Sequence, residues 1–249
     1  MDTIRLVEEL AANAWAPYTV QTLGEWRLRA AFGVTKRANS AWTAGNVPDG
    51  PWLAAVEEFY ERRGLAPCFY VCDATPAGVD DALEAAGYEV LFPCYMMKGA
   101  VEDVLAAAPP DDRFEARLEP EADDRWIADF LRLEGFETAR TSAYAHIFRA
   151  IGPKKTFLRL ADRDGALVAL ATGVTERGFA GISNVIVAPE HRRRGAGAQT
   201  LRAIAAWAKE QGAERLWLQV LAENAPAIAL YRKLGFEKLS RNHYRLKRR

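Results

Sequence analysis

The second half of the chain alternates between two hydrophobic periods. Apolar residues at every second position predict strands, and apolar residues three or four positions apart predict helices. The predicted strands are Arg113–Leu118, Lys155–Ala161, Ala166–Thr175, Gly181–Ala188, Arg215–Leu221 and a final strand or hairpin at the C-terminus. The predicted helices are Glu121–Glu134, Ser142–Ile151, a segment through Leu201 and Ile204 that ends at Gly212, and Pro226–Leu234. This order predicts an α/β fold with a mixed central sheet and helices on both faces.

The first half repeats part of this pattern. A shift of 148 positions places Leu53 on Leu201, Gly64 on Gly212 and Gly87 on Gly235, without a gap over about 40 residues. Upstream, residues 39–42 match residues 184–187 if the loop that follows is about three residues shorter. We interpret this as a second copy of the same unit. The linker at residues 106–112, which contains two prolines, places the domain boundary between residues 110 and 111.

Charge divides the two halves, although the net charge of the chain is zero. Residues 1–111 contain 8 Lys and Arg against 16 Asp and Glu, and residues 112–249 contain 25 against 17. Opposite fields across a cleft and two independent solvated surfaces both fit this asymmetry. No apolar run reaches the roughly 18–20 residues of a membrane helix, and the start is acidic and amphipathic rather than signal-like. We therefore expect a cytoplasmic protein without membrane contact, whose three cysteines are buried thiols.

The segment Asn184–Ala198 joins a strand to a helix through a turn rich in arginine and glycine. Such a turn directs several backbone N–H groups at one anion, and the helix dipole adds its positive end. Gly195 and Gly197 remove side chains where the backbone approaches phosphate groups, and the three preceding arginines add charge. The pattern is neither GxxxxGK[ST] nor GxGxxG, so it predicts a pyrophosphate site without a P-loop NTPase or a Rossmann dehydrogenase. We call residues 192–198 the cradle loop.

A second motif follows, Asn224-Ala-Pro-Ala-Ile-Ala-Leu-Tyr-Arg-Lys-Leu-Gly-Phe236. Together the two motifs resemble those of the GCN5-related N-acetyltransferase (GNAT) superfamily. The family's acetyl-CoA signature, Arg/Gln-x-x-Gly-x-Gly/Ala, stands as Arg192-Arg-Arg-Gly195-Ala-Gly197. Its later signature, Asn-x-x-Ala-x-x-Leu-Tyr-x-Lys-x-Gly-Phe, is almost whole, with Pro226-Ala227 at the small-residue step. The element order of residues 112–249 is also that of the family. With the internal repeat, the resemblance implies a tandem GNAT-like acyl-CoA N-acyltransferase fold.

The resemblance implies acetyl-CoA as co-substrate and no metal ion. In the family, the strand before the loop binds the pantetheine arm through its backbone, as an added strand would pair. The loop N–H groups would hold the pyrophosphate, and Asn224 would bond to the pantetheine arm or shape the splayed strands. The implied binding residues are Val185, Ile186, Val187, Arg192, Arg193, Arg194, Gly195, Ala196, Gly197, Ala198 and Asn224. We expect the side chains of the three strand residues to pack into the core.

The resemblance also implies direct attack of an amine on the thioester, with Tyr231 as general acid to the departing thiolate. A phenol with a pKa near 10 is protonated at pH 7, and a thiolate with a pKa of about 8.5 accepts its proton. Core packing is the other interpretation of Tyr231. Many relatives take the amine proton with a Glu near the strand before the loop, where this chain has Ser183 and Asn184. Possible substitutes are Glu134, Glu137, Glu176 and His146, and the base stays unassigned.

We predict a catalytic domain at residues 111–249 and a degenerate copy at residues 1–110. In the repeat, Leu83 takes the place of Tyr231 and Pro76 that of Asn224, and Thr43–Gly50 contains no arginine. The predicted function is acetyl-CoA-dependent N-acetylation of a small-molecule or peptide amine, by a monomer or homodimer. The alternative is a non-catalytic acyl-CoA-binding sensor or pseudoenzyme, which turnover with any amine would exclude.

Two other classes have little support in the sequence. A nucleic-acid site would use the basic C-terminus, but no aromatic side chains are interleaved with its cations, so a solvated terminal strand is favoured. The basic residues concerned are Arg241, Arg245, Lys247, Arg248 and Arg249. The three histidines have no metal-ligand spacing, so a metal enzyme is not predicted.

Overall fold

The computed structural model describes residues 3–247, whose contacts divide the chain into two units. Unit 1 contains the described residues up to Tyr95, the short segment Leu221–Glu223 and the residues from Leu239 onward. Unit 2 contains Met96–Val220 and Asn224–Lys238.

The division differs from the boundary that we predicted at residue 110. Strand β5 (Glu89–Ala100) begins in unit 1 and ends in unit 2, and strand β11 (Glu237–Leu246) begins in unit 2 and ends in unit 1. Helix α4 (Val101–Ala107) follows β5, and Arg202 of unit 2 bonds to carbonyls at its C-terminal end and just beyond. The proline linker therefore lies inside unit 2, because a strand and a helix that precede it pack there.

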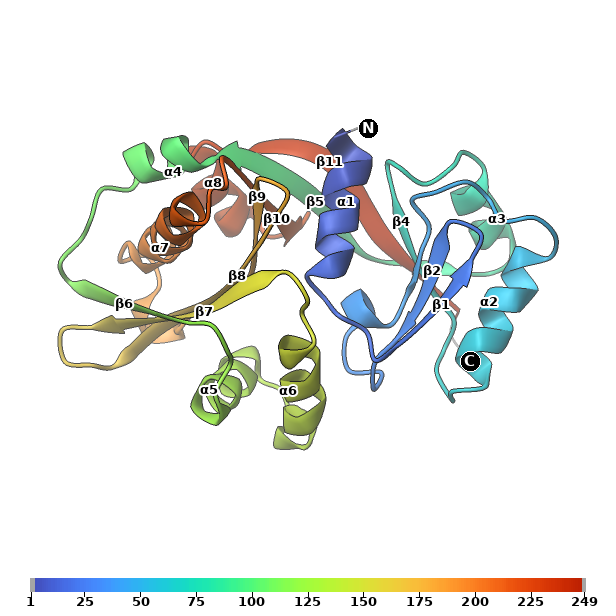
Figure 1. Cartoon of the computed structure of the whole chain (residues 1–249), viewed down its shortest axis with the longest axis horizontal. Coiled ribbons are helices and arrows are strands. Elements are labelled where there is room, and N and C mark those ends of the chain that lie inside the picture. The colour runs from blue at the N-terminus through green and yellow to red at the C-terminus, as the bar shows by residue number, and fades with distance from the viewer. Residues whose placement is uncertain (1–2, 248–249) are drawn as a thin grey trace. The chain divides into compact units, whose positions relative to one another are not determined.

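Unit 2 places α5 and α6 on one face of its sheet and α7 on the other (Figure 1). The Trp126 ring of α5 packs edge-on against Phe157 of β7, with 5.0 Å between ring centroids. On the opposite face, the missing side chain of Gly173 leaves room for Trp207 of α7. Five strands run in the order β10-β9-β8-β7-β6, and only the β9–β10 pair is parallel. The elements are β6 (Phe114–Glu119), α5 (Asp124–Glu134), η2 (Thr138–Arg140), α6 (Thr141–Arg149), β7 (Lys154–Asp162), β8 (Leu167–Glu176), β9 (Phe179–Val187), η3 (Pro189–His191), α7 (Ala196–Glu210), β10 (Arg215–Leu221) and α8 (Ala225–Lys233).

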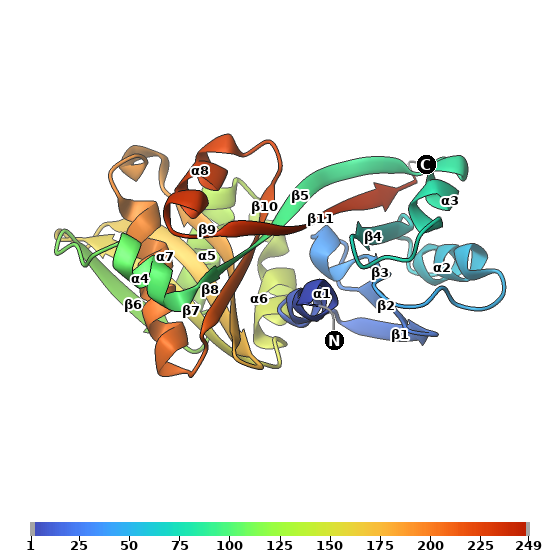
Figure 2. The same cartoon turned by 90° about the horizontal axis from the view of Figure 1, so that it is seen from above.

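In unit 1 the strand order is β1-β2-β3-β4-β11, with α1 on one face of these strands and α2 and α3 on the other (Figure 2). On the α1 face, Ala12 packs with Trp42, Tyr70 and Tyr244. On the other face, Phe59 and Leu83 pack with Phe69. The elements are α1 (Thr3–Asn13), β1 (Thr19–Leu23), β2 (Trp26–Ala30), η1 (Lys36–Ala38), β3 (Ala41–Trp42), α2 (Trp52–Glu61), β4 (Cys68–Cys72) and α3 (Val79–Ala85).

The repeat in the sequence is also a repeat in secondary structure. The series α2-β4-α3-β5 in the first half corresponds to α7-β10-α8-β11 in the second. Strands β5 and β11 begin at Glu89 and Glu237, a difference of 148 residues, which is the offset found in the sequence. The glycines that end the paired helices, Gly64 with Gly212 and Gly87 with Gly235, all have positive φ angles between 66° and 87°. Only a residue without a Cβ takes this left-handed conformation at little cost, so the turns are shared for a physical reason.

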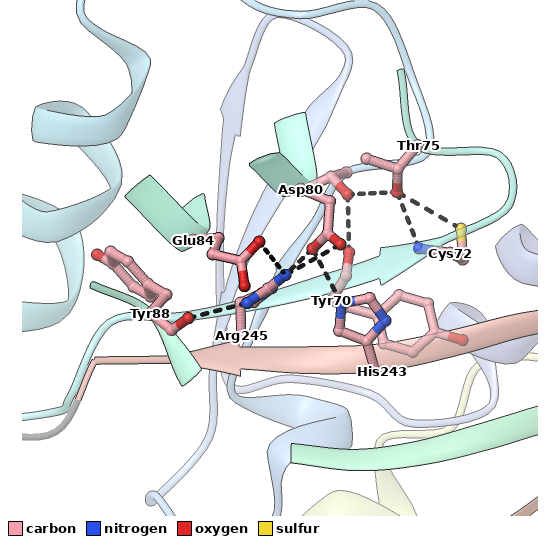
Figure 3. A network of polar contacts seen from close by, with 9 residues as sticks. Tyr70, Cys72, Thr75, Asp80, Glu84, Tyr88, His243 and Arg245 are labelled. Atoms are coloured by element: carbon pink, nitrogen blue, oxygen red, sulfur yellow. Dashed lines mark hydrogen bonds and ion pairs between the residues drawn. The ribbon is translucent and has the colours of Figure 1, made fainter. Parts of the chain in front are cut away.

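A polar network holds the end of β11 in unit 1 (Figure 3). Strand β11 pairs antiparallel with β4, with Tyr244 opposite Tyr70. The Arg245 guanidinium donates to both carboxylate oxygens of Asp80, at 2.7 and 3.1 Å, and His243 Nε2 lies 2.9 Å from the same carboxylate. Arg245 is therefore buried in an ion pair rather than part of an exposed basic surface. Arg248 and Arg249, which belong to the same basic end, lie outside the described residues.

The predicted buried thiols are confirmed: Cys68, Cys72 and Cys94 are free and buried. Burial raises the pKa of Cys68 to about 12, so this thiol is a poor nucleophile at neutral pH. Among residues 3–247, no helix combines the length and apolar character needed to cross a membrane. The same residues include no cluster of three or more His, Cys, Asp or Glu side chains arranged to bind a metal ion.

Candidate active site

Strands β9 and β10 pair only over their first halves. Their parallel register runs from Phe179 opposite Arg215 to Ile182 opposite Leu218, and it stops there although both strands continue. Burial changes at the same point, because residues 179–182 are buried and residues 183–187 are half-buried. In the described part of the chain, the edge of residues 183–187 that turns toward β10 thus has no strand partner. Such an edge can bind a ligand that offers amide groups in an extended chain.

A β-bulge lies where the two strands separate. The register between β8 and β9 shifts by one residue between Leu170 and Thr172, and Asn184 on the opposite strand has a φ angle of 52°. Asparagine is among the residues that best tolerate this left-handed conformation. Its Nδ2 donates a hydrogen bond of 3.0 Å to Thr172 Oγ1, and the Thr172 side chain is buried. Asn184 therefore fixes the bulge, which twists the following residues of β9 away from regular pairing.

The three strand residues predicted to contact pantetheine lie on this open segment. Val185, Ile186 and Val187 are half-buried, so the expected packing of their side chains into the core is only partial. Val187 packs at the margin of a small cluster that includes Leu160 and Ala196. The separation of the strands is the reason, because among the described residues no strand pairs with this segment on its β10 side.

The cradle loop combines left-handed backbone with an uncapped helix. Arg193 and Gly195 have φ angles of 61° and 91°. A left-handed residue next to residues of ordinary φ turns successive N–H groups toward one concave side. Helix α7 begins at Ala196, and no side chain caps it at Gly195. The first N–H groups of a helix have no partner within the helix, so those of Ala196, Gly197 and Ala198 are donors for an anion.

The side chains of Arg192, Arg193 and Arg194 are exposed around these donors. Arg192 Nε also donates to the carbonyl of Val187, at 3.2 Å, which ties the loop back to the end of β9. The structure thus brings the predicted phosphate-binding residues together at the end of the open strand edge.

Gly197 also meets a packing requirement within the protein. A Cβ at Gly197 would lie 2.9 Å from Leu230 Cδ2 of α8 and 3.9 Å from Val187 Cγ2. The missing side chain therefore lets the end of β9, the first turn of α7 and helix α8 meet. Gly195 needs glycine for another reason, its φ angle of 91°.

Tyr231 follows Leu230 in α8, so it belongs to the helix that packs on the cradle loop. Its side chain is only 7% exposed, and its ring lies 6.0 Å from that of Phe236. Burial raises the pKa of Tyr231 to about 12, so the phenol keeps its proton well above neutral pH. Both interpretations of this residue, proton donor and core residue, fit this geometry.

Asn224 caps helix α8. Its Oδ1 accepts a hydrogen bond of 3.2 Å from the backbone N–H of Ala227. It stands after the end of β10, beyond the point where β9 and β10 separate. The carbonyl of its amide is therefore used by the helix, which supports a role in shaping the end of the splayed strands.

One candidate for the base is too far from the bulge. Glu176 pairs with Phe179 at the start of β9 and forms an ion pair of 3.4 Å with Arg177. Phe179 precedes Asn184 by five residues, or roughly 16 Å of extended strand at about 3.3 Å per residue. Of the other candidates, Glu134 is exposed at the last residue of α5, Glu137 is exposed just after α5, and His146 is half-buried on α6. The base therefore stays unassigned.

The motifs did not reveal the side chains that connect the segment before β6 with α7 and with the cradle loop. Gln199 Nε2 of α7 donates to the carbonyl of Pro109 at 2.8 Å, and Arg202 Nη1 donates to those of Leu105 and Ala108 at 3.0 and 2.9 Å. Arg113 Nη2 lies 3.4 Å from the carbonyl oxygen of Arg194. Side chains that bond to backbone carbonyls leave no residue pattern at the accepting end, so sequence reasoning had no signal for this contact.

Comparisons with known proteins cover the whole chain. A family described as "Probable histone acetyltransferase Rv0428c C-terminal" matches residues 2–245. The "Uncharacterized N-acetyltransferase YobR" of Bacillus subtilis (strain 168) is 44% identical over 248 residues, which is 100% of both chains.

Two solved structures share the fold. One is a "GCN5-related N-acetyltransferase from Kribbella flavida", with a TM-score of 0.76 and 19% identity over 99% of this chain and 96% of that chain. The other is a "Tandem GNAT protein from the clavulanic acid biosynthesis pathway (without AcCoA)", with a TM-score of 0.69 and 18% identity over 96% and 86%. At this identity the likeness concerns the fold alone, and it confirms the predicted fold.

Proposed function

Because the chain belongs to the GCN5-related N-acetyltransferase superfamily and is an N-acetyltransferase, we propose that it transfers an acetyl group from acetyl-CoA to a primary amine by direct attack. The acceptor is a small molecule or a peptide. The observation that carries the proposal is the open edge of β9, which leads directly into the cradle loop.

These residues fit acetyl-CoA. The backbone edge of Val185, Ile186 and Val187 offers donors and acceptors to the two amides of a pantetheine arm. The arm ends in a pyrophosphate, and the uncapped first turn of α7 with its three exposed arginines suits that charge. Asn224 supports this arrangement through the cap of α8.

Acetyl-CoA supplies a thioester, whose acetyl group passes to the amine nitrogen as the C–S bond breaks. Tyr231 holds a proton on Oη and gives it to the departing sulfur, and solvent later returns a proton to Oη. The raised pKa keeps that proton in place at neutral pH. The amine loses one proton to water or to a base that has no assignment. Backbone N–H groups at the bulge stabilise the negative charge that develops on the carbonyl oxygen.

We propose that unit 1 binds no acetyl-CoA. Its strands β3 and β4 pair at Ala41–Phe69 and Trp42–Tyr70, and the next residue, Thr43, donates from Oγ1 to the carbonyl of Tyr70 at 2.7 Å. Thr43 Oγ1 also lies 2.8 Å from Thr75 Oγ1, and Thr75 Oγ1 accepts from the N–H of Cys72 (Figure 3). Side chains thus bridge these two strands beyond their paired residues, where the corresponding strands of unit 2 are open.

Calorimetric titration with acetyl-CoA tests this function. We expect one site per chain, and at least a tenfold weaker Kd for Arg193→Glu, because a carboxylate would face the pyrophosphate. Arg163→Glu, an exposed arginine on the β7–β8 turn, is the control for the same charge change. Gly197→Glu is a poor variant, because its side chain would collide with Leu230.

Each other outcome of the titration has one meaning. Two sites per chain would contradict the proposal for unit 1. No binding at all would contradict the proposed function. Equal losses in Arg193→Glu and Arg163→Glu would show that the cradle loop acts only through long-range charge.

A further inference from the structure

The peptide between Arg194 and Gly195 is held from outside the cradle loop. Nη2 of Arg113, the residue just before β6, lies 3.4 Å from the carbonyl oxygen of Arg194. In a trans peptide the C=O and the following N–H point in opposite directions. A donor that holds the Arg194 carbonyl on one side therefore aims the N–H of Gly195 at the other side, where the uncapped helix start receives its anion.

This peptide needs a restraint. It joins Arg194 to Gly195, and both Gly195 and Arg193, the residue before Arg194, have left-handed φ angles. The left-handed conformation is unfavourable for a residue with a side chain, and it persists where neighbouring groups hold it. Without a partner for the Arg194 carbonyl, the peptide could rotate and present an oxygen, rather than an N–H, to the phosphates.

Arg113 is itself fixed in place. Asp111 accepts from Arg113 Nε at 2.9 Å and from Nη2 at 2.5 Å, and its Oδ1 also accepts from the Arg113 backbone N–H at 3.1 Å. These bonds hold the pKa of Asp111 at about 2, so the carboxylate is charged at any physiological pH. The bonds from Gln199 to Pro109 and from Arg202 to Ala108 dock the preceding segment on α7. Asp111 thus fixes the guanidinium, whose Nη2 also lies near the carbonyl of Arg194 in the cradle loop.

We infer that Arg113, held by Asp111, is a positioning residue for the anion site of the cradle loop. The inference rests on the proposed function, because it concerns how that loop binds acetyl-CoA. A charge role is the competing explanation, since an arginine beside a phosphate site also attracts it directly. Substitution of Asp111 distinguishes the two roles, because they predict opposite changes in the Kd. If Arg113 acts by charge, removing the Asp111 carboxylate improves binding; if it acts by position, the same change weakens binding.

The test is calorimetric titration of the full chain with acetyl-CoA. We expect Arg113→Ala and Asp111→Asn each to raise the Kd about three- to tenfold, the range of one net hydrogen bond. The matched control is Arg117→Ala on β6, which removes an exposed arginine from a similar ion pair, 2.8 Å from Glu119 Oε1. It should change the Kd less than twofold. Thermal unfolding midpoints of all four proteins should agree, which separates a local effect on the loop from a loss of folding.

Three results would overturn the inference. A lower Kd in Asp111→Asn would show that Arg113 acts by charge. A Kd for Arg113→Ala equal to that of Arg117→Ala would show that the contact with Arg194 has no consequence. A rise in Kd accompanied by a lower unfolding midpoint would reduce the pair to a stabilising contact. Failure of the wild-type chain to bind acetyl-CoA is a separate result, which would overturn the proposed function as well.

Discussion

At the scale of single residues, Tyr231 is a buried side chain that we propose as the general acid. We predict that Tyr231→Phe lowers kcat about 100-fold, the lower range for a lost general acid, and leaves the acetyl-CoA Kd within twofold. The measurement is release of free CoA with spermidine, or with whichever amine of a screen supports turnover. Because the pKa of Tyr231 is about 12, its proton is lost only as the pH rises through that value. Up to pH 10, kcat of the wild type should therefore not fall relative to kcat of the variant. Retention of kcat in Tyr231→Phe would instead make this tyrosine a core residue.

Glu8 is a buried carboxyl group whose charge state changes near neutral pH. It is 0% exposed, accepts a 2.6 Å hydrogen bond from the Tyr70 hydroxyl and lies 3.3 Å from Ser240 Oγ. Burial raises its pKa to about 7, with the Tyr70 and Ser240 hydrogen bonds opposing the shift. The folded state therefore holds a proton that the unfolded state releases at lower pH. The contribution of Glu8 to stability is favourable at acidic pH and is lost as the pH rises to 7.

We predict that Glu8→Gln removes this dependence. Between pH 5.5 and 8, wild type should lose roughly 2 kcal/mol of unfolding free energy that the variant keeps, from about 1.36 kcal/mol per pKa unit. The glutamine carbonyl can still accept from Tyr70. Denaturant unfolding at the two pH values measures the difference, and Glu61→Gln, on the exposed side of α2, controls for the loss of one negative charge. The same change of unfolding free energy with pH in wild type and Glu8→Gln would contradict the attribution of this change to Glu8.

At the scale of elements, the sequence predicted what local periodicity and turn chemistry determine. Strand β10 is observed over Arg215–Leu221 as predicted, and Gly212 and Gly235 end α7 and α8 in the left-handed conformation. Such elements follow from alternation and from the freedom of glycine. The order of strands and helices in residues 112–249 was correct for the same reason.

The elements that sequence reasoning missed depend on long-range pairing. No local pattern shows that β9 leaves β10 after Ile182, because apolar residues resume at Val185–Val187 as they would in a paired strand. The bulge at Asn184 depends on the buried hydroxyl of Thr172, twelve residues earlier on another strand. Arg113 reaches the loop across 81 residues through a backbone carbonyl. For the site, the sequence therefore predicted the loop and its charges but not the contacts that aim its N–H groups.

At the scale of the whole molecule, the two units share two strands. Residues 96–100 of β5 lie in unit 2, where β5 is the neighbour of β10 and the N–H of Val101 donates to the carbonyl of Glu214 at 3.0 Å. Residues 239–246 of β11 lie in unit 1, against β4. The boundary that composition indicates at residue 110 thus separates each unit from a strand that completes its sheet. An edge left in this way exposes unpaired backbone groups and apolar surface.

We predict that neither fragment of a chain divided at residue 110 folds alone. Fragment 1–110 lacks the β11 residues that bond to Glu8 and Asp80, and fragment 111–249 lacks α4 and the end of β5. Each should give a poorly dispersed amide spectrum and bind a hydrophobic dye, whereas coexpressed fragments should copurify and bind acetyl-CoA like the intact chain. The coexpressed pair is the control, because its chain is cut at the same exposed prolines. A fragment 111–249 that folded and bound acetyl-CoA by itself would show that unit 2 needs no strand from the first half, and that the linker marks the true domain boundary.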